Sequence, residues 1–148
     1  LMINLNLSMN CIQFIEKGSF DTLNYLRILD LSHNQLIGLF ELSLEQKLMT
    51  IFLESNRIDK ISFDTYFLQH FHFRNNNLTQ IPVFSKIVIR IIEIDFNKIN
   101  KIDYSSFEGM RNLAILSLSN NQIETIDSKS FQDLRWLSSL AVSYTHLT

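Results

Sequence analysis

The fold is decided by a repeated stretch that is clearest from Leu113 to Leu134, LAILSLSNNQIETIDSKSFQDL. Its first part follows the pattern L-x-x-L-x-L-x-x-N-x-I, with the asparagine at Asn121. Five earlier segments carry the same pattern in frame, and a seventh copy begins at Leu137. The earlier asparagines are Asn10, Asn34, Asn56, Asn76 and Asn97. Successive asparagines are separated by 24, 22, 20, 21 and 24 residues, so the chain is a series of repeats that stack into a solenoid.

Each position of the pattern has a physical reason. The L-x-L core alternates with period two, so Leu29 and Leu31 are predicted to point inward while Asp30 and Ser32 point outward. Short strands from stacked coils then form a parallel sheet. The asparagine closes the turn after the strand, and its amide can bond backbone groups in its own coil and in the next. The six asparagines are therefore predicted to form a ladder along the molecule.

Two further apolar positions in each repeat are predicted to fill the opposite, convex side. The position five residues after the asparagine is Ile15, Leu39, Ile61, Ile81, Ile102 and Ile126, and the position ten after it is Phe20, Leu44, Tyr66, Phe107 and Phe131. The fourth repeat has Lys86 at the latter position, and its short period predicts a tighter segment beginning at Ile81-Pro82. The predicted fold is an α/β solenoid, a right-handed arc with a parallel concave sheet and an irregular or short 3-10 convex side.

Composition and charge exclude several classes of function. With 148 residues and 46% hydrophobic content the chain is expected to form one domain. A net charge of −2 provides no field that would attract nucleic acid, and no uncharged stretch is long enough to insert into a membrane. The single cysteine, Cys11, cannot form an internal disulfide and is expected to be buried.

The ends of the sequence give a separate prediction. The chain begins inside a repeat with no signal peptide, so we expect residues 1–141 to be a solenoid fragment with six full repeats and the start of a seventh. Residues Val142 to Leu147 resemble the translation of a sequencing adapter, so 142–148 are expected to be a non-native tail. The alternative is a divergent capping repeat.

The pattern resembles the extracellular "typical" leucine-rich repeat, L-x-x-L-x-L-x-x-N-x-I-x-x-I-x-x-x-x-F-x-x-L. Its Ile/Asn/Phe-rich style is similar to insect leucine-rich-repeat proteins, including mosquito immune proteins, and to Toll-like receptor ectodomains. The resemblance implies a secreted or cell-surface module that recognises a protein partner in innate immunity or adhesion, and it leaves room for a dimer in the full-length protein. The alternative is a cytoplasmic scaffold or regulatory repeat region of a larger protein, which could be an enzyme.

No motif for catalysis, for a cofactor or for a metal occurs, so the chain itself is predicted not to be an enzyme. What remains is the outward side of the predicted sheet, where neighbours in a row lie about 4.8 Å apart. The candidate partner-binding residues there are Phe52, Glu54, His70, His72, Arg74, Glu93, Asp95 and Phe96. Two other interpretations stay open, namely ion pairs that only solvate the sheet and a metal site built from His70, His72, Glu93 and Asp95. In a secreted protein Asn77 and Asn6, each in an N-x-S/T sequon, would be candidate glycosylation sites, with Asn77 preferred because it lies at a turn.

Overall fold

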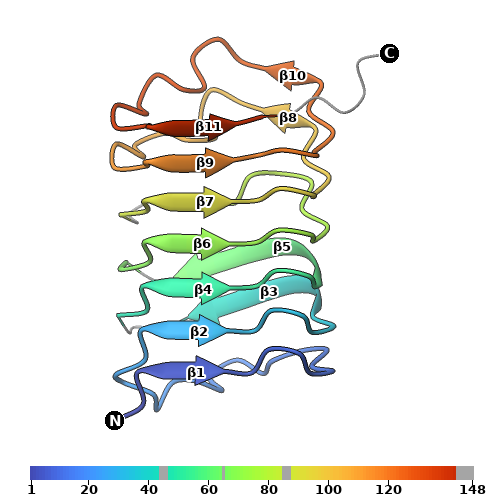
Figure 1. Ribbon diagram of the computed structural model, residues 1–148, viewed down its shortest axis with the longest axis vertical. Helices are drawn as coiled ribbons and strands as arrows, with labels where there is room; N and C mark the ends of the chain where they lie inside the picture. Colours follow the sequence, from blue (N-terminus) through green and yellow to red (C-terminus); the bar gives the residue numbers. More distant parts are fainter. Residues whose placement is uncertain (44–46, 65, 85–87, 143–148) are drawn as a thin grey trace.

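The computed structural model describes residues 1–43, 47–64, 66–84 and 88–142. Seven short parallel strands form one sheet in the order β1-β2-β4-β6-β7-β9-β11 (Figure 1). These strands are β1 (Asn4–Asn6), β2 (Ile28–Asp30), β4 (Thr50–Phe52), β6 (His70–His72), β7 (Ile91–Glu93), β9 (Ile115–Ser117) and β11 (Ser139–Ala141). One strand comes from each repeat, and β11 belongs to the seventh copy.

The register of the sheet follows the repeat without slippage. Leu29 of β2 pairs with Ile51 of β4, which in turn occupies the same level as Phe71 of β6. These middle residues are fully buried, whereas the first and third residues of the same strands are half-exposed. The predicted parallel sheet and solenoid are therefore confirmed.

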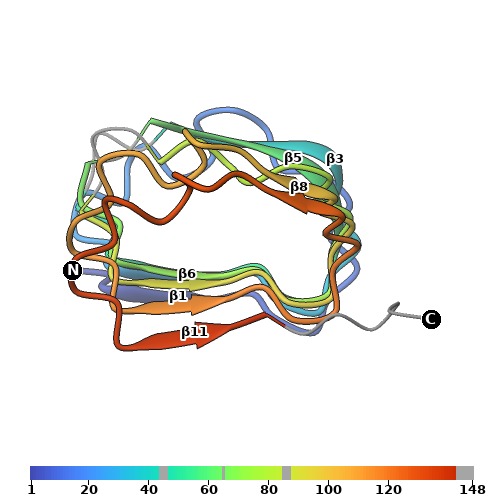
Figure 2. The same cartoon turned by 90° about the horizontal axis from the view of Figure 1, so that it is seen from above.

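The remaining strands lie on the opposite side of the solenoid from the seven-stranded sheet. Seen from above, a coil is a flattened loop (Figure 2). In the second and third coils, β3 (Ile37–Ser43) and β5 (Arg57–Asp64) pair in parallel along their length. A shorter pair is formed by β8 (Lys101–Ile102) and β10 (Thr125–Ile126). The convex side is thus irregular in part, as predicted, but it includes two two-stranded sheets that the repeat pattern did not indicate.

Three predictions about the convex positions are wrong. Leu39, Tyr66 and Ile126 were expected to be inside, yet Leu39 and Tyr66 are each 54% exposed and Ile126 is 38% exposed. In the second coil the chain alternates without interruption after Leu36, so Phe40 and Leu42 point inward instead of Leu39. The third coil inserts an additional residue, because Gly38 pairs with Ile58 while Leu39 pairs with Lys60. Because β5 has this additional residue, Ile61 packs against the core. Because β3 lacks it, Leu39 points outward.

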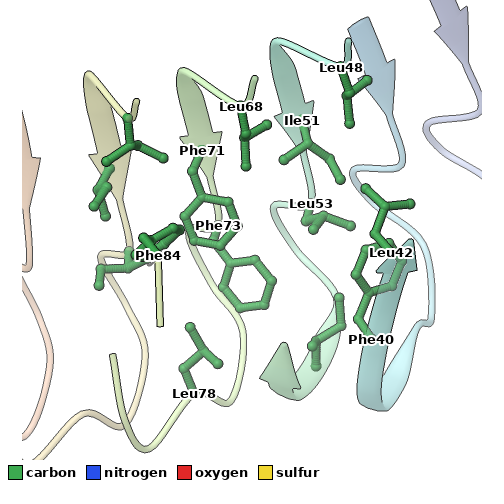
Figure 3. Packing of buried hydrophobic residues seen from close by; sticks show 14 of the residues in the cluster. Phe40, Leu42, Leu48, Ile51, Leu53, Leu68, Phe71, Phe73, Leu78 and Phe84 are labelled. Atoms are coloured by element: carbon green, nitrogen blue, oxygen red, sulfur yellow. The ribbon is translucent and has the colours of Figure 1, made fainter. Parts of the chain in front are cut away.

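Large aromatic side chains fill the core of the fourth coil (Figure 3). Phe71 contacts Phe73, Phe63 and Phe84, with ring centroids 5.2, 5.4 and 5.3 Å apart. This repeat and the one before it are the two shortest, with 21 and 20 residues between successive asparagines. The rings fill the core volume of this coil. The segment beginning at Ile81-Pro82 turns into the core at Phe84, whereas Lys86 and Leu44 lie outside the described residues.

Five of the six ladder asparagines are buried and bond the backbone of two coils, whereas Asn10 in the first coil is exposed and bonds only its own coil. The Asn97 amide donates to Ile94 and Asp95 carbonyls in its own coil and to the Phe73 carbonyl, and its oxygen accepts from Leu78 N–H at 3.0 Å. The same arrangement recurs at Asn34, Asn56, Asn76 and Asn121. The second coil reached is the preceding one, not the next one as the sequence suggested.

The residue before each asparagine explains this direction. All six such residues have positive φ values, from 53° to 56°, and they are Met9, His33, Ser55, Asn75, Phe96 and Asn120. Where the acceptor is described, their N–H groups donate to carbonyls of the following coil, as from His33 to Glu54 at 2.8 Å. Consecutive positions thus bond opposite neighbours, the left-handed residue the following coil and the asparagine the preceding one.

Two remaining predictions concern Cys11 in the first coil and the C-terminal tail. Cys11 is exposed, which corrects the expectation of burial. It follows the ladder asparagine, and Gln35, Arg57, Lys98 and Gln122 at the same position in other coils are exposed too. Of the predicted non-native tail only Val142 is described, and it packs against the core. Within the described ranges there is no helix long and apolar enough to cross a membrane.

Candidate protein-binding face

The outward side chains of the seven-stranded sheet form one surface, which we call the concave face. It consists of the first and third residues of each strand together with the residue two positions beyond. The strand pairing places Asp30, Phe52, His72 and Glu93 in one row. All the predicted partner-binding residues lie on this face or, in the case of Phe96, in the turn directly after it.

Four of these residues form a connected network on β6 and β7. His72 Nδ1 lies 2.5 Å from Glu93 Oε2, and the other oxygen of Glu93 accepts from Arg74 Nη2 at 3.3 Å. Arg74 Nε lies 3.1 Å from Asp95 Oδ2. The contact between Arg74 and Asp95 is an ion pair, but its geometry is not that of a hydrogen bond. Arg74 is half-exposed, so the network is fixed from below and open to solvent above.

Asp95 is held by the next coil as well. Its Oδ1 accepts from the Ser117 hydroxyl and from Ser119 N–H, and the residue is only 4% exposed. A buried carboxylate with two donors and an ion pair is compensated. Asp95 thereby connects Arg74 of the preceding coil to Ser117 and Ser119 of the following coil.

Glu54 differs from the arrangement that its row suggests. Arg74 lies between Glu54 and Asp95 in the row, but its ion pairs are with Glu93 and Asp95. Glu54 Oε2 is buried with no hydrogen-bond partner. Burial raises the pKa of Glu54, and the nearby Asp30 and Glu93 carboxylates raise it further against the opposing effects of its own backbone and His72.

Aromatic groups complete the face. The rings of Phe52 and His72 stack with centroids 4.6 Å apart and planes inclined by 13°. Both residues are half-buried, so the stack presents its edges to solvent. Phe96 is 57% exposed, and it is held in a left-handed conformation that bulky residues rarely adopt. The rings of Phe52 and His72 hold each other in place, and Phe96 adds exposed aromatic surface beside them.

His70 is separate from the network. Its Nδ1 lies 3.2 Å from Thr50 Oγ1, and burial lowers its pKa, with His72 and Arg90 lowering it further. A metal site from His70, His72, Glu93 and Asp95 would need these groups to converge. In the part of the chain that the structure describes, no three His, Cys, Asp or Glu side chains are grouped so that they could hold a metal ion.

Some residues of the face were not singled out from the sequence. Asp30 stands beside Phe52 and influences Glu54, although the repeat marks it only as an outward position. The left-handed residues were missed as a class. Their identities offer a partial signal, because Asn75, Asn120 and His33 are types that tolerate positive φ, but Met9 and Phe96 are not.

The two sequons occupy different environments. Asn6 is exposed on β1, and its Oδ1 accepts from Ser8 N–H at 2.9 Å and from the Ser8 hydroxyl at 2.7 Å. Asn77 is half-buried at the turn after Asn76, and its N–H donates to the Ile58 carbonyl at 2.8 Å. Asn6 shares the concave face, whereas Asn77 does not.

Comparison with known families fits this architecture. A family model described as leucine rich repeat matches residues 2–36 and 87–147, more than half of the sequence. With the parallel solenoid and the asparagine ladder already established, the chain belongs to the leucine-rich repeat family. The resemblance drawn from the repeat is thereby confirmed.

Particular relatives narrow the comparison. Tsukushi-A of Xenopus laevis is 33% identical over 149 residues, covering 80% of this chain and 42% of the relative. Tsukushi of Gallus gallus is 30% identical over 150 residues, covering 80% of this chain and 40% of the relative. The chain therefore spans about two fifths of the length of these curated relatives.

A solved structure gives the same fold. A chain in the structure of the Toll–Spatzle complex, described as a molecular hub in Drosophila development and innate immunity, superposes with a TM-score of 0.53. The match covers 84% of this chain and 22% of that chain at 19% identity. At this identity the likeness shows the fold alone.

Proposed function

We propose that this chain is an extracellular recognition module that binds a protein partner through its concave face and performs no catalysis of its own. The observation that carries the proposal is the ordered cluster on β4, β6 and β7. Phe52 stacks on His72, which is fixed by Glu93, while Asp95 and Glu93 orient Arg74. Aromatic and arginine side chains held in place are typical of the residues that dominate protein interfaces.

The extracellular part of the proposal is supported by the type of repeat. The chain resembles the "typical" repeat of secreted and surface proteins. The Toll–Spatzle complex, whose fold it shares, is described as a molecular hub in Drosophila development and innate immunity. A role in innate immunity or adhesion is the biological form of the proposal. The cytoplasmic alternative gains no observation from the fold or from the relatives.

In this setting Asn77 is proposed to carry an N-glycan, and Asn6 is the second candidate. A glycan at Asn6 would cover the first strand of the concave face. Peptide mass analysis of the chain secreted from insect cells tests both positions. The proposed extracellular setting predicts modification at Asn77, and secretion with both asparagines unmodified would contradict the glycosylation proposal.

A pair of aromatic substitutions tests the binding proposal. The secreted chain is assayed on an array of purified extracellular proteins as the parent, as Phe52→Ala and as Tyr104→Ala, the last being a 62% exposed aromatic away from the sheet. Truncation of a central aromatic is expected to weaken binding by 2 kcal/mol or more, about thirtyfold, while Tyr104→Ala leaves it unchanged. Thermal unfolding checks that both variants are folded. Equal effects of the two substitutions on binding would then overturn the proposal.

A further inference from the structure

The charges of the concave face are unequally compensated. On the β6–β7 half of the face every carboxylate has a cation, because Arg74 pairs with both Glu93 and Asp95. On β2 and β4 the carboxylates of Asp30 and Glu54 have no ion-pair partner among the described residues. The β2–β4 half therefore presents a negative patch that the chain itself does not neutralise.

Local bonds hold one carboxylate of this patch, and one oxygen of the other has no hydrogen-bond partner. Asp30 Oδ1 accepts from Ser32 N–H at 3.0 Å and from the Ser32 hydroxyl at 2.6 Å, which fixes its orientation. Glu54 is half-buried, with Oε2 unpartnered, and burial and Asp30 both raise its pKa. A positive group arriving from outside would favour the charged form of Glu54.

Phe52 provides a flat surface beside the two carboxylates. Phe52 lies between Asp30 of β2 and His72 of β6 in the same row of the sheet. His72 covers the side toward β6 by stacking at 4.6 Å. The opposite side of the ring is directed toward β2, where the neighbour in the row is the short side chain of Asp30. An aromatic face next to two carboxylates matches a planar guanidinium, which stacks on rings and pairs with carboxylates through its fixed N–H groups.

Resting on the proposed function, we propose that the Asp30–Phe52–Glu54 corner of the concave face binds an arginine side chain presented by the protein partner. The arginine stacks on the β2 side of Phe52 and pairs with Asp30 and Glu54. The occupant is a protein cation because a phosphate backbone would be repelled by these carboxylates. It is not a metal ion, because the described residues hold no group of three or more metal-ligating side chains.

Peptide selection tests this inference with a defined probe. A random peptide library is selected on the parent chain, and the strongest binders are synthesised with each arginine as itself and as citrulline, which keeps the shape and removes the charge. Affinities are measured for the parent, for Asp30→Asn with Glu54→Gln, and for the control Glu108→Gln with Glu124→Gln, which removes two exposed carboxylates elsewhere. We expect the selected binders to be rich in arginine. Their Kd should rise at least about tenfold when arginine is replaced by citrulline, or when the chain carries Asp30→Asn with Glu54→Gln. The control variant should leave the Kd unchanged.

The outcomes separate the inference from the proposed function. Binders that lose affinity with Phe52→Ala but are indifferent to citrulline and to the Asp30→Asn, Glu54→Gln variant would overturn the arginine site and leave the concave face as the binding surface. Binders indifferent to every concave substitution, or no binders at all, would overturn both. Thermal unfolding of the double variant provides a folding check, and we expect it to be at least as stable as the parent because Glu54→Gln removes an uncompensated carboxylate.

Discussion

At the scale of single residues, two adjacent positions tie each coil to both of its neighbours. The left-handed residue donates its N–H to the following coil, and the asparagine bonds the preceding one. Each asparagine saturates backbone groups that the strand leaves unpaired when the chain turns into the core. The six asparagines could be predicted from the sequence because the pattern shows them directly, whereas the left-handed residues share a conformation but no side-chain type.

The substitution Asn97→Ala tests the asparagine ladder. It removes the acceptor of Leu78 N–H and the donor to Phe73 and Ile94, all in a buried site. We expect the free energy of unfolding to fall by about 1 to 3 kcal/mol. Asn10→Ala is the matched control, since Asn10 is exposed and bonds only its own coil. Chemical denaturation that finds the two variants equally stable would show that the ladder does not hold the coils.

The substitution Phe96→Asn tests the conformational strain at the edge of the concave face. Phe96 has a φ of 53° and is more than half-exposed, so a residue that tolerates the left-handed region relieves strain and loses little packing. We expect the free energy of unfolding to rise by about 1 kcal/mol. A loss of stability in denaturant titration would mean that packing of the ring outweighs the strain.

The titration of His70 gives a pH dependence with a defined sign. Its pKa is lowered in the folded protein, so the unfolded chain binds the proton more readily. The contribution of His70 to the free energy of unfolding is therefore fully present above pH 6.5, the ordinary pKa of histidine, and is lost as the pH falls below that value. Thermal unfolding across this window should show a smaller decline for His70→Gln than for the parent. The same pH dependence of stability in His70→Gln and in the parent would show that His70 does not contribute to it.

At the scale of elements, the strand β3 shows where a repeat pattern stops being sufficient. Aligning the repeats places Leu39 with Ile61 and Ile102, yet the uninterrupted alternation from Leu36 puts Phe40 inside. The sheet strands were predictable because three residues with one buried position leave a single register. The convex strands were not, because a one-residue insertion in β5 relative to β3 changes which face points inward, and consensus spacing does not reveal that shift.

A pair of truncations tests this assignment of β3. Phe40 is 6% exposed and Leu39 is 54% exposed. Phe40→Ala is expected to destabilise the protein by about 3 to 5 kcal/mol, since it leaves a cavity. Leu39→Ala should stay within about 0.5 kcal/mol of the parent. Urea denaturation in which Leu39→Ala is the more damaging variant would restore the assignment made from the repeat alone.

At the scale of the whole molecule, the solenoid separates stability from recognition. The core and the ladder lie inside and between coils, while the concave face carries side chains that the fold does not need for its spacing. The repeat therefore predicts where a binding face lies, and the outward rows could be listed in advance. The pairing within that face could not, because Arg74 can reach carboxylates on either side and only the three-dimensional arrangement selects Glu93 and Asp95.

Steric masking of one face is the most direct test of the claim that a partner binds the sheet. In a Cys11→Ser background, which removes the exposed native thiol, a single cysteine is introduced as Ile91→Cys on β7 or as Lys129→Cys on the opposite side, and each is coupled to a polyethylene glycol maleimide. Binding to the partner found on the protein array is then measured before and after coupling. We expect coupling at Ile91→Cys to abolish binding and coupling at Lys129→Cys to leave it unchanged. Binding that survives the label on β7, or is lost only with the label at position 129, would contradict it.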